Sequence, residues 1–335
     1  PPYDIISDGE RAEYLARNPH NVIRLELPKG EDPYGEAGRT LREWLADGTL
    51  KCDDDAGIYI YEEEFLTGVD HGEKRALKGI ICLVRVEDFD AGVVLPHEET
   101  LSKAKQDRFS LMQATNCNFS QIYSLYMDET GETRRRIDHL SSGTPRYEFS
   151  DGLVTHRLWI VNDAVAIEAF RSDFAARRLY IADGHHRYET AINYRNYCRE
   201  NAVWAPGSEF VMMMLVDMEN PGLVVFPTHR LVRGLPDFSP EQVLAGSAAY
   251  FDAETLSDRG AVEPRLKADY DAGKKSFVFA AVQDGALTYT LLTLRDPSVM
   301  ADFLPEKSEA SRGLDVSVLH TLILERVLGI DKENM

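Results

Sequence analysis

The stretch YIADGHHRYETA (180–191) places an acidic residue, a glycine, two histidines and an arginine in consecutive positions. The apolar run before it predicts a strand, and the segment 187–201 after it predicts a helix with Tyr188, Ala191 and Ile192 along one side. A strand, a glycine turn and a helix leave backbone N–H groups unpaired at the helix N-terminus. Such a terminus carries roughly half a positive charge and binds phosphate. The stretch therefore predicts a phosphate-binding turn.

Each polar residue of this turn has a candidate role. Gly184 lets the backbone approach a ligand closely. Arg187 can add a bidentate contact to phosphate, and His185 or His186 a further donor. The carboxylate of Asp183 is free to cap the helix, to bind Mg²⁺ or to orient a substrate hydroxyl. The alternative is a capped helix with exposed histidines, and the order Asp-Gly-x-His-Arg favours phosphate binding over it.

A zinc site is the competing chemical interpretation of the histidines. Adjacent histidine side chains on one turn rarely converge on one ion. His97 and Glu98 could join them, but HEETL (97–101) lacks the second histidine of an HExxH motif, because Leu101 stands there. We therefore expect no histidine-ligated zinc and assign no residue as a metal ligand.

Two further segments carry polar side chains where strands are predicted to end. The loop PHEETLSKAKQDR (96–108) lies between a predicted strand and a predicted helix, where sites are usually built. A carboxylate there can take a proton from a hydroxyl nucleophile, which contributes about 10²–10⁴ in rate. The segment PTHRLV (227–232) ends an apolar strand with a His-Arg pair. The candidate substrate-binding residues from these segments are His97, Thr100, Arg108, His229 and Arg230.

Composition limits the classes of function. The chain has 335 residues and a formal net charge of −19, with 56 acidic against 37 basic residues. Proteins that bind nucleic acid non-specifically need clustered basic residues, so this balance argues against nucleic acid as a partner. The four cysteines are scattered, as expected in a reducing cytoplasm. No run approaches the roughly 20 apolar residues of a membrane helix. We expect a cytoplasmic protein without a membrane partner.

Predicted strands and helices alternate irregularly along the chain. Strands or hairpins are predicted at 21–28, 57–65, 77–89, 121–128, 145–161, 208–232 and 275–294. Helices are predicted at 11–18, 37–48, from about 105, and at 187–201, 239–255, 260–272 and 315–330, with TRRRID (133–138) as a solvated turn. Without regular βαβ alternation, the pattern favours an α+β (mixed α/β) fold. The pattern of predicted elements changes near residue 206, which predicts domains at 1–205 and 206–335.

The chain resembles a bacterial and archaeal family catalogued as domain of unknown function 1015. The motifs that carry this resemblance are PPYDIIS, HEET followed by K and DR, THRLW, IADGHHRYETA and PTHRLV, in that order. They span about two thirds of the chain. Family members also carry a C-terminal segment with a Lys-Ser-Thr pattern, which these 335 residues do not contain.

A more distant resemblance bears on function. PHE in a loop, followed by IADGHHR, is similar to the archaeal free-serine kinases of the ParB/sulfiredoxin superfamily. The resemblance implies a ParB/sulfiredoxin-like phosphate-binding core with inserted strands and a C-terminal α+β part. It implies Glu98 as catalytic base and Asp183 as its partner, with ATP or ADP and Mg²⁺ as cofactors. The phosphates would be held by Gly184, His185, His186 and Arg187.

These observations favour a nucleotide-dependent small-molecule phosphotransferase, and within that class a free L-serine kinase that makes O-phosphoserine. One alternative is a phosphoserine phosphatase or nucleotide hydrolase that uses the same site. Another is a non-catalytic ParB-like nucleotide-binding switch, which the acidic charge disfavours. A sulfiredoxin-type activity is disfavoured because its motif requires cysteine where His185 stands. We expect nucleotide and a small molecule as partners, with a homo-oligomer left open.

Overall fold

The structure of the protein is a computed structural model that describes residues 3–67, 72–98, 102–225, 229–235, 238–283 and 285–331. Helices and strands are mixed along the chain, which confirms the predicted α+β class. The chain forms two compact units, Pro1–Phe226 and Pro227–Met335.

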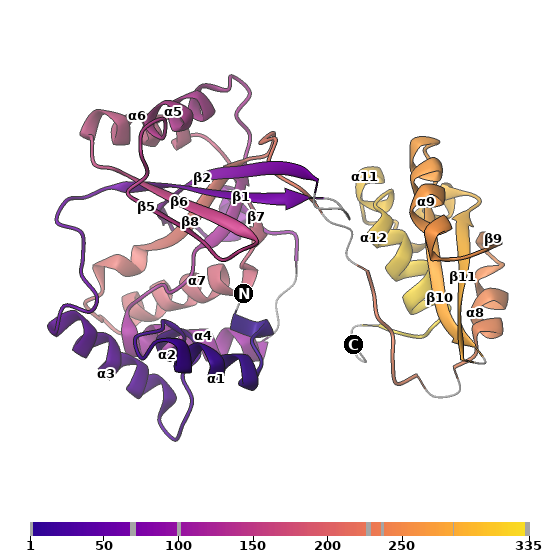
Figure 1. Ribbon diagram of the computed structural model, residues 1–335, viewed down its shortest axis with the longest axis horizontal. Coiled ribbons are helices and arrows are strands. Elements are labelled where there is room, and N and C mark those ends of the chain that lie inside the picture. The colour runs from indigo at the N-terminus through magenta and orange to yellow at the C-terminus, as the bar shows by residue number, and fades with distance from the viewer. Residues whose placement is uncertain are drawn as a thin grey trace. The chain divides into compact units, whose positions relative to one another are not determined.

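Within the described residues, the N-terminal unit contains one mixed eight-stranded sheet (Figure 1). Its strands are β1 (Ile58–Thr67), β2 (Glu73–Arg85), β3 (Val94–Leu95), β4 (Ile122–Tyr126), β5 (Tyr147–Ser150), β6 (Val154–Val161), β7 (Leu179–Asp183) and β8 (Phe210–Asp217). They lie in the order β3–β7–β4–β8–β2–β1–β6–β5. The pairs β3–β7 and β4–β8 are parallel, and the other pairs are antiparallel.

The sheet is covered by helices on both faces. Figure 1 shows α5 and α6 on one side of it and α4 and α7 on the other. The helices of this unit are α1 (Asp8–Arg17), α2 (Ile23–Glu26), α3 (Pro33–Ala46), α4 (Ser102–Thr115), α5 (Glu132–Leu140), α6 (Ala164–Phe174) and α7 (His185–Glu200). Alternate strand residues such as Ile60, Ile80 and Met213 are fully buried in the core. Each such side chain contributes about 1.5–3 kcal/mol to the free energy of unfolding.

Several local signals specify these elements. The Ser7 hydroxyl accepts a hydrogen bond from the Glu10 backbone N–H, and the Glu10 carboxylate accepts one from the Ser7 backbone N–H. The predicted capping box is therefore present at the start of α1. The hairpin β5–β6 turns at Asp151 and Gly152, where Gly152 has a φ of +95°. Both features depend on residues within four positions of each other, which is why the sequence alone predicts them.

The unit boundary lies beyond the expected position at 205/206. The strand β8 follows that position, yet it pairs with β2 on one side and with β4 on the other. Met213 and Leu215 of β8 belong to the same buried cluster as Ile60 and Ile80. The strand β8 therefore belongs to the N-terminal core, and the first unit extends beyond it.

Three other expectations for the N-terminal unit are wrong. The predicted strand 21–28 contains the short helix α2, whose Leu25 packs with Leu41 and Trp44. TRRRID lies in helix α5 rather than in a turn, because Thr133 and Ile137 form a narrow buried stripe beneath exposed arginines. No strand follows β8 among the described residues up to 225, so the predicted hairpin 208–232 is a single strand there.

The C-terminal unit contains a three-stranded antiparallel sheet in the order β10–β11–β9. Its elements are α8 (Pro240–Ser247), β9 (Phe251–Leu256), α9 (Val262–Asp271), β10 (Ser276–Gln283), β11 (Ala286–Leu294), α10 (Met300–Phe303), α11 (Glu309–Arg312), α12 (Asp315–Val318) and the π-helical η6 (Leu319–Glu325). The expected helix 239–255 ends early, because Phe251 starts a strand that pairs with β11. In the expected helix 315–330, Val318 and Leu322 are buried as predicted, but α12 continues as η6.

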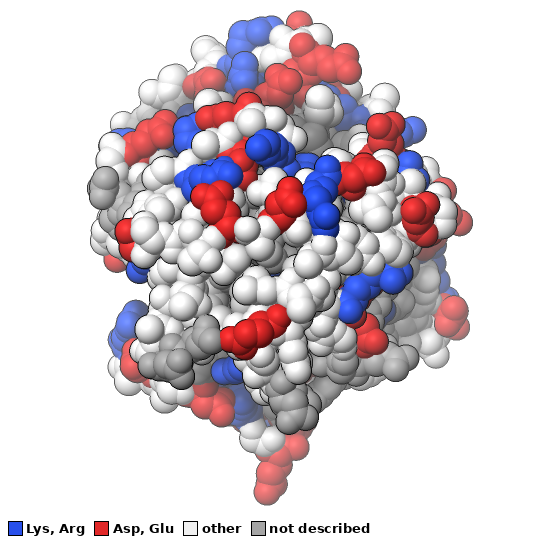
Figure 2. All heavy atoms as spheres, turned by 90° about the vertical axis from the view of Figure 1, so that its right-hand side faces the viewer, with Lys and Arg blue, Asp and Glu red and all other residues white. Residues whose placement is uncertain are grey.

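The surface carries charges of both signs. Figure 2 shows basic and acidic side chains interspersed with uncharged ones on the face that it presents, among the residues drawn in colour. No helix in the described part of the chain is long and apolar enough to cross a membrane.

The turn after β8 packs closely against the backbone of β2, and a substitution in this turn can test that contact. A Cβ atom on Gly222 would lie 1.9 Å from the carbonyl oxygen of Ala76 in β2. Gly222→Ala is therefore expected to lower the free energy of unfolding by about 1–3 kcal/mol, because the turn must move away from the strand. Urea unfolding measures the change. Gly207→Ala is the control, since a Cβ there would meet no atom within 4 Å outside its own segment of chain. Equal effects of the two substitutions would contradict the contact.

Candidate functional site

The turn between β7 and α7 has the backbone that the sequence predicts. β7 ends at Asp183, Gly184 adopts a φ of +96°, and α7 begins at His185. A positive φ is accessible to glycine without strain. Within the described part of the chain, no side-chain cap is found at this helix end. Its first N–H groups are therefore donors that an anionic ligand can take.

Parallel pairing brings the loop that contains Glu98 to this turn. Leu95 of β3 lies opposite Tyr180 of β7. Glu98 and Asp183 each come three residues after this pair, so both carboxylates lie at the same edge of the sheet. The backbone N–H of His97 donates a hydrogen bond to His185 Nε2 at 3.2 Å. The structure thus places the two motifs that we expected to form one site beside each other.

His185 is the buried centre of this contact. Its side chain is 2% exposed, and its Nδ1 lies 3.4 Å from Glu98 Oε2. The rings of His185 and His97 meet edge to face with centroids 4.4 Å apart. Burial holds the pKa of His185 below its usual 6.5, and His97 acts in the same direction. Glu98 and Asp183 raise the pKa but do not outweigh burial.

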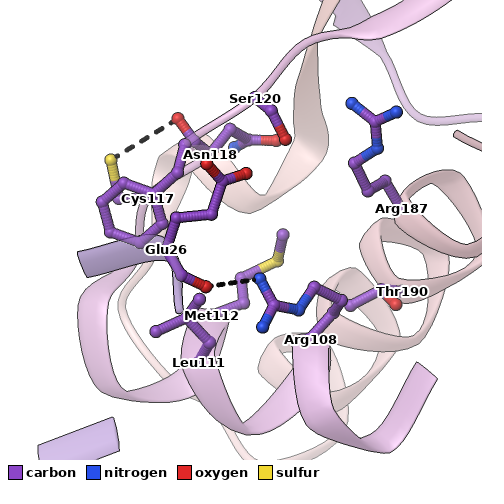
Figure 3. A pocket seen from close by; sticks show the side chains of 10 residues that line it. Glu26, Arg108, Leu111, Met112, Cys117, Asn118, Ser120, Arg187 and Thr190 are labelled. Carbon is purple, nitrogen blue, oxygen red and sulfur yellow. Dashed lines mark hydrogen bonds between the residues drawn. The ribbon is translucent and has the colours of Figure 1, made fainter. Parts of the chain in front are cut away.

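Two arginines lie close to the turn. Arg187 hydrogen-bonds the carboxylate of Asp183 and the carbonyl of Gln121. Arg108 of α4 is buried, donates to the carbonyl of Glu26 at 2.8 Å, and stacks over the Tyr3 ring at 4.0 Å. Both arginines line one cavity of about 40 Å³. Figure 3 shows their side chains among the residues that surround it. A cavity of this volume has room for only a few water molecules, so it is not by itself a nucleotide pocket.

The helices that carry these arginines are linked by a second charged pair. Lys105 Nζ in α4 lies 2.6 Å from Glu189 Oε2 in α7. Both side chains are about three-quarters buried, with exposures of 25% and 24%. Partial burial reduces screening by water, so this pair holds the two helices together more firmly than an exposed pair.

Comparison with known proteins assigns the chain to a family. A family model described as "Protein of unknown function (DUF1015)" matches residues 1–317. The chain belongs to this family. No curated protein and no solved structure matches it.

The family motifs of this DUF1015 protein do not all lie in one unit. His229 and Arg230 belong to the C-terminal unit, where an Arg230 guanidinium nitrogen lies 3.2 Å from His320 Nε2. Thr100 lies outside the described residues. His186 is half-buried in the first turn of α7. Contact of these four residues with a ligand stays a prediction.

Sequence reasoning gave no role to one residue beside the end of β7, Tyr123. Tyr123 of β4 lies opposite Asp183, and a β-bulge follows, because the next residue, Ser124, pairs with Ile181. Bulges redirect side chains and are common beside active sites. The phenol oxygen of Tyr123 is buried and has no hydrogen-bond partner among the described residues. The tyrosine pattern of QIYSLYMD (121–128) is the signal in the sequence, but it also fits an ordinary core strand.

The same geometry bears on metal binding in this DUF1015 protein. His97, Glu98 and His185 each place a ligand atom within 4.8 Å of the others. A histidine that binds a metal through Nδ1 carries its proton on Nε2, which then usually donates a hydrogen bond. Here Nε2 accepts one from the His97 backbone. The polarity of this bond therefore opposes an ion on Nδ1, although the distances admit one.

The lowered pKa of His185 predicts how stability depends on pH. The unfolded chain takes up a proton on this residue near its usual pKa of 6.5, whereas the folded chain does so only at lower pH. The free energy of unfolding therefore decreases as pH falls through about 6.5 toward the folded pKa. Between about pH 7.5 and about pH 5.5, wild type should lose more thermal stability than His185→Gln. Equal losses in melting-temperature measurements would show that His185 does not contribute.

Proposed function

We propose that this DUF1015 protein is a nucleotide-dependent phosphotransferase with free L-serine as acceptor, built on a ParB/sulfiredoxin-like core. The observation that carries the proposal is the parallel β3–β7 pair, which sets Glu98 and Asp183 beside the uncapped start of α7. Phosphoryl transfer asks a protein mainly to position groups and to neutralise charge. A helix end, an arginine and two carboxylates supply these functions.

Each residue has a role in the proposed reaction. Backbone N–H groups at 184–187 and the Arg187 guanidinium bind the phosphates of ATP or ADP. Glu98, whose side chain is 60% exposed, accepts the proton of the serine hydroxyl as that oxygen attacks the terminal phosphorus. The terminal phosphoanhydride bond breaks, and the nucleotide leaves one phosphate shorter with the electron pair of that bond on its new terminal oxygen. Asp183, 64% exposed at the side chain, orients the hydroxyl or the metal.

Mg²⁺ suits the donor atoms of this site. It prefers carboxylate oxygen ligands and keeps several waters, so one or two carboxylates together with substrate phosphates suffice to hold it. One oxygen of the exposed Asp183 carboxylate bonds Arg187, which leaves the other oxygen available to Mg²⁺. When bound, Mg²⁺ would neutralise phosphate charge.

Two assays test the proposal. Thermal-shift measurements with ATP, ADP, serine and phosphoserine should show stabilisation by a nucleotide with Mg²⁺, because a ligand of the folded state raises its apparent stability. Incubation with serine and each nucleotide should then yield O-phosphoserine, detected by mass spectrometry. Release of phosphate from phosphoserine without transfer to serine would reverse the assigned direction. Absence of transfer to any small hydroxyl compound would refute the kinase.

A further inference from the structure

We infer that His185 is a positioning residue that holds the carboxylate of Glu98 through an Nδ1–H group, and that its imidazole is not a phosphate ligand. The inference rests on the proposed function in that it concerns the base of the same reaction. The part of the inference that concerns the protonation state of the ring can be tested without an activity assay.

The polarity of one hydrogen bond determines where the proton lies on the ring. A backbone N–H can only donate, so His185 Nε2 must present its lone pair to His97. The ring is neutral because burial disfavours the imidazolium, and a neutral imidazole carries one N–H. That proton is therefore on Nδ1, the nitrogen that faces Glu98 Oε2 at 3.4 Å.

The two contacts of the ring hold consecutive residues of the loop. Nε2 fixes the backbone of His97, and Nδ1 faces the side chain of the next residue, Glu98. His185 can do this because its position at the first residue of α7 buries it beside the loop that follows β3. Glu98 itself is mostly exposed and would otherwise sample several rotamers. The distance of 3.4 Å is long for a hydrogen bond, as is common before substrate tightens a catalytic contact.

A phosphate-binding role fits the side chain poorly. A ring that is 2% exposed, with each nitrogen directed at a protein group, has no free donor for a ligand. The backbone N–H of residue 185 keeps that role, because no described side chain caps the helix. The histidine at this position therefore connects phosphate binding by the backbone to placement of the base.

Nitrogen-15 NMR of the full chain with labelled histidines tests the protonation state. At about pH 7.5, the His185 ring should be neutral with its proton on Nδ1. The signal is assigned among the nine histidines by its loss in His185→Gln. A ring protonated on Nε2, or on both nitrogens, would overturn the inference whether or not the protein is a kinase.

Steady-state kinetics tests the positioning. In His185→Gln, the longer amide can still accept from His97 but cannot donate at the Nδ1 position, and kcat for serine phosphorylation should fall about 10- to 100-fold. The KM for nucleotide should change less than about twofold, because the contacts that bind nucleotide equally in the ground state and the transition state are unaffected. His185→Asn places an amide N–H near the Nδ1 position and should recover part of kcat. His139→Gln, on the exposed end of α5, is the matched control.

The outcomes separate the inference from the proposed function. Wild-type kcat in His185→Gln, or a rise in KM without loss of kcat, would overturn the positioning role while leaving the kinase intact. Inactivity of the wild type would refute the kinase, and the NMR result would still decide the state of the ring. Stoichiometric binding of Zn²⁺ or Mn²⁺ that is lost in both His185→Gln and His97→Gln would overturn the inference in favour of a metal site.

Discussion

Glu98→Gln is expected to lower kcat for serine phosphorylation by about 10²–10⁴, to the limit of detection in most assays. The amide has nearly the shape of the carboxylate but cannot accept the hydroxyl proton. Nucleotide affinity should remain close to that of the wild type, because the helix end and Arg187 are unchanged. Radiolabel transfer from nucleotide to serine measures the first quantity, and calorimetry the second.

A matched control guards against a non-specific effect of the same substitution. Glu168→Gln changes an exposed glutamate on α6, which pairs only loosely with Arg171 at 3.5 Å, and should leave kcat unchanged. Wild-type turnover by Glu98→Gln on every hydroxyl substrate tested would show that the base has been assigned to the wrong residue. If Glu98→Gln lost both nucleotide binding and turnover, Glu98 would instead belong to the phosphate site.

Arg187→Ala is expected to weaken nucleotide binding by roughly 10- to 100-fold, because hydrogen bonds to charged groups contribute about 1.5–3 kcal/mol. The substitution also frees the carboxylate of Asp183, which then repels phosphate. The structure sharpens this expectation, since Arg187 already reaches from α7 to the end of β7 and to the carbonyl of Gln121. Calorimetric titration with ATP and with ADP in the presence of Mg²⁺ measures the loss.

The comparison for this variant is Arg171→Ala, an exposed arginine on α6 with a side-chain exposure of 76%. It should bind nucleotide as the wild type does. Because removal of Arg187 also takes away two internal bonds, circular dichroism must first show that the variant is folded. Unchanged nucleotide affinity in a folded Arg187→Ala protein would mean that the phosphates lie elsewhere.

Much of the fold was predictable because its signals are local. The capping box at Ser7 and Glu10 and the Asp-Gly turn at 151–152 depend on residues that are neighbours in sequence. The errors arose where distant contacts overrode local pattern. Leu25 lies in a helix because it packs with Leu41 and Trp44, and Phe251 begins a strand because β11 lies beside it. Composition could not reveal either contact.

By itself, the sequence determined the strand, the glycine turn and the helix of the candidate site, because Gly184 accepts a positive φ and the flanking periodicities are local. It also determined family membership through motifs in a fixed order. Only the tertiary structure decided that Glu98 lies beside His185, since the parallel pairing of β3 with β7 joins segments far apart in the chain. The burial and proton position of His185 follow from that pairing, because a backbone N–H of the distant loop supplies the bond to its ring.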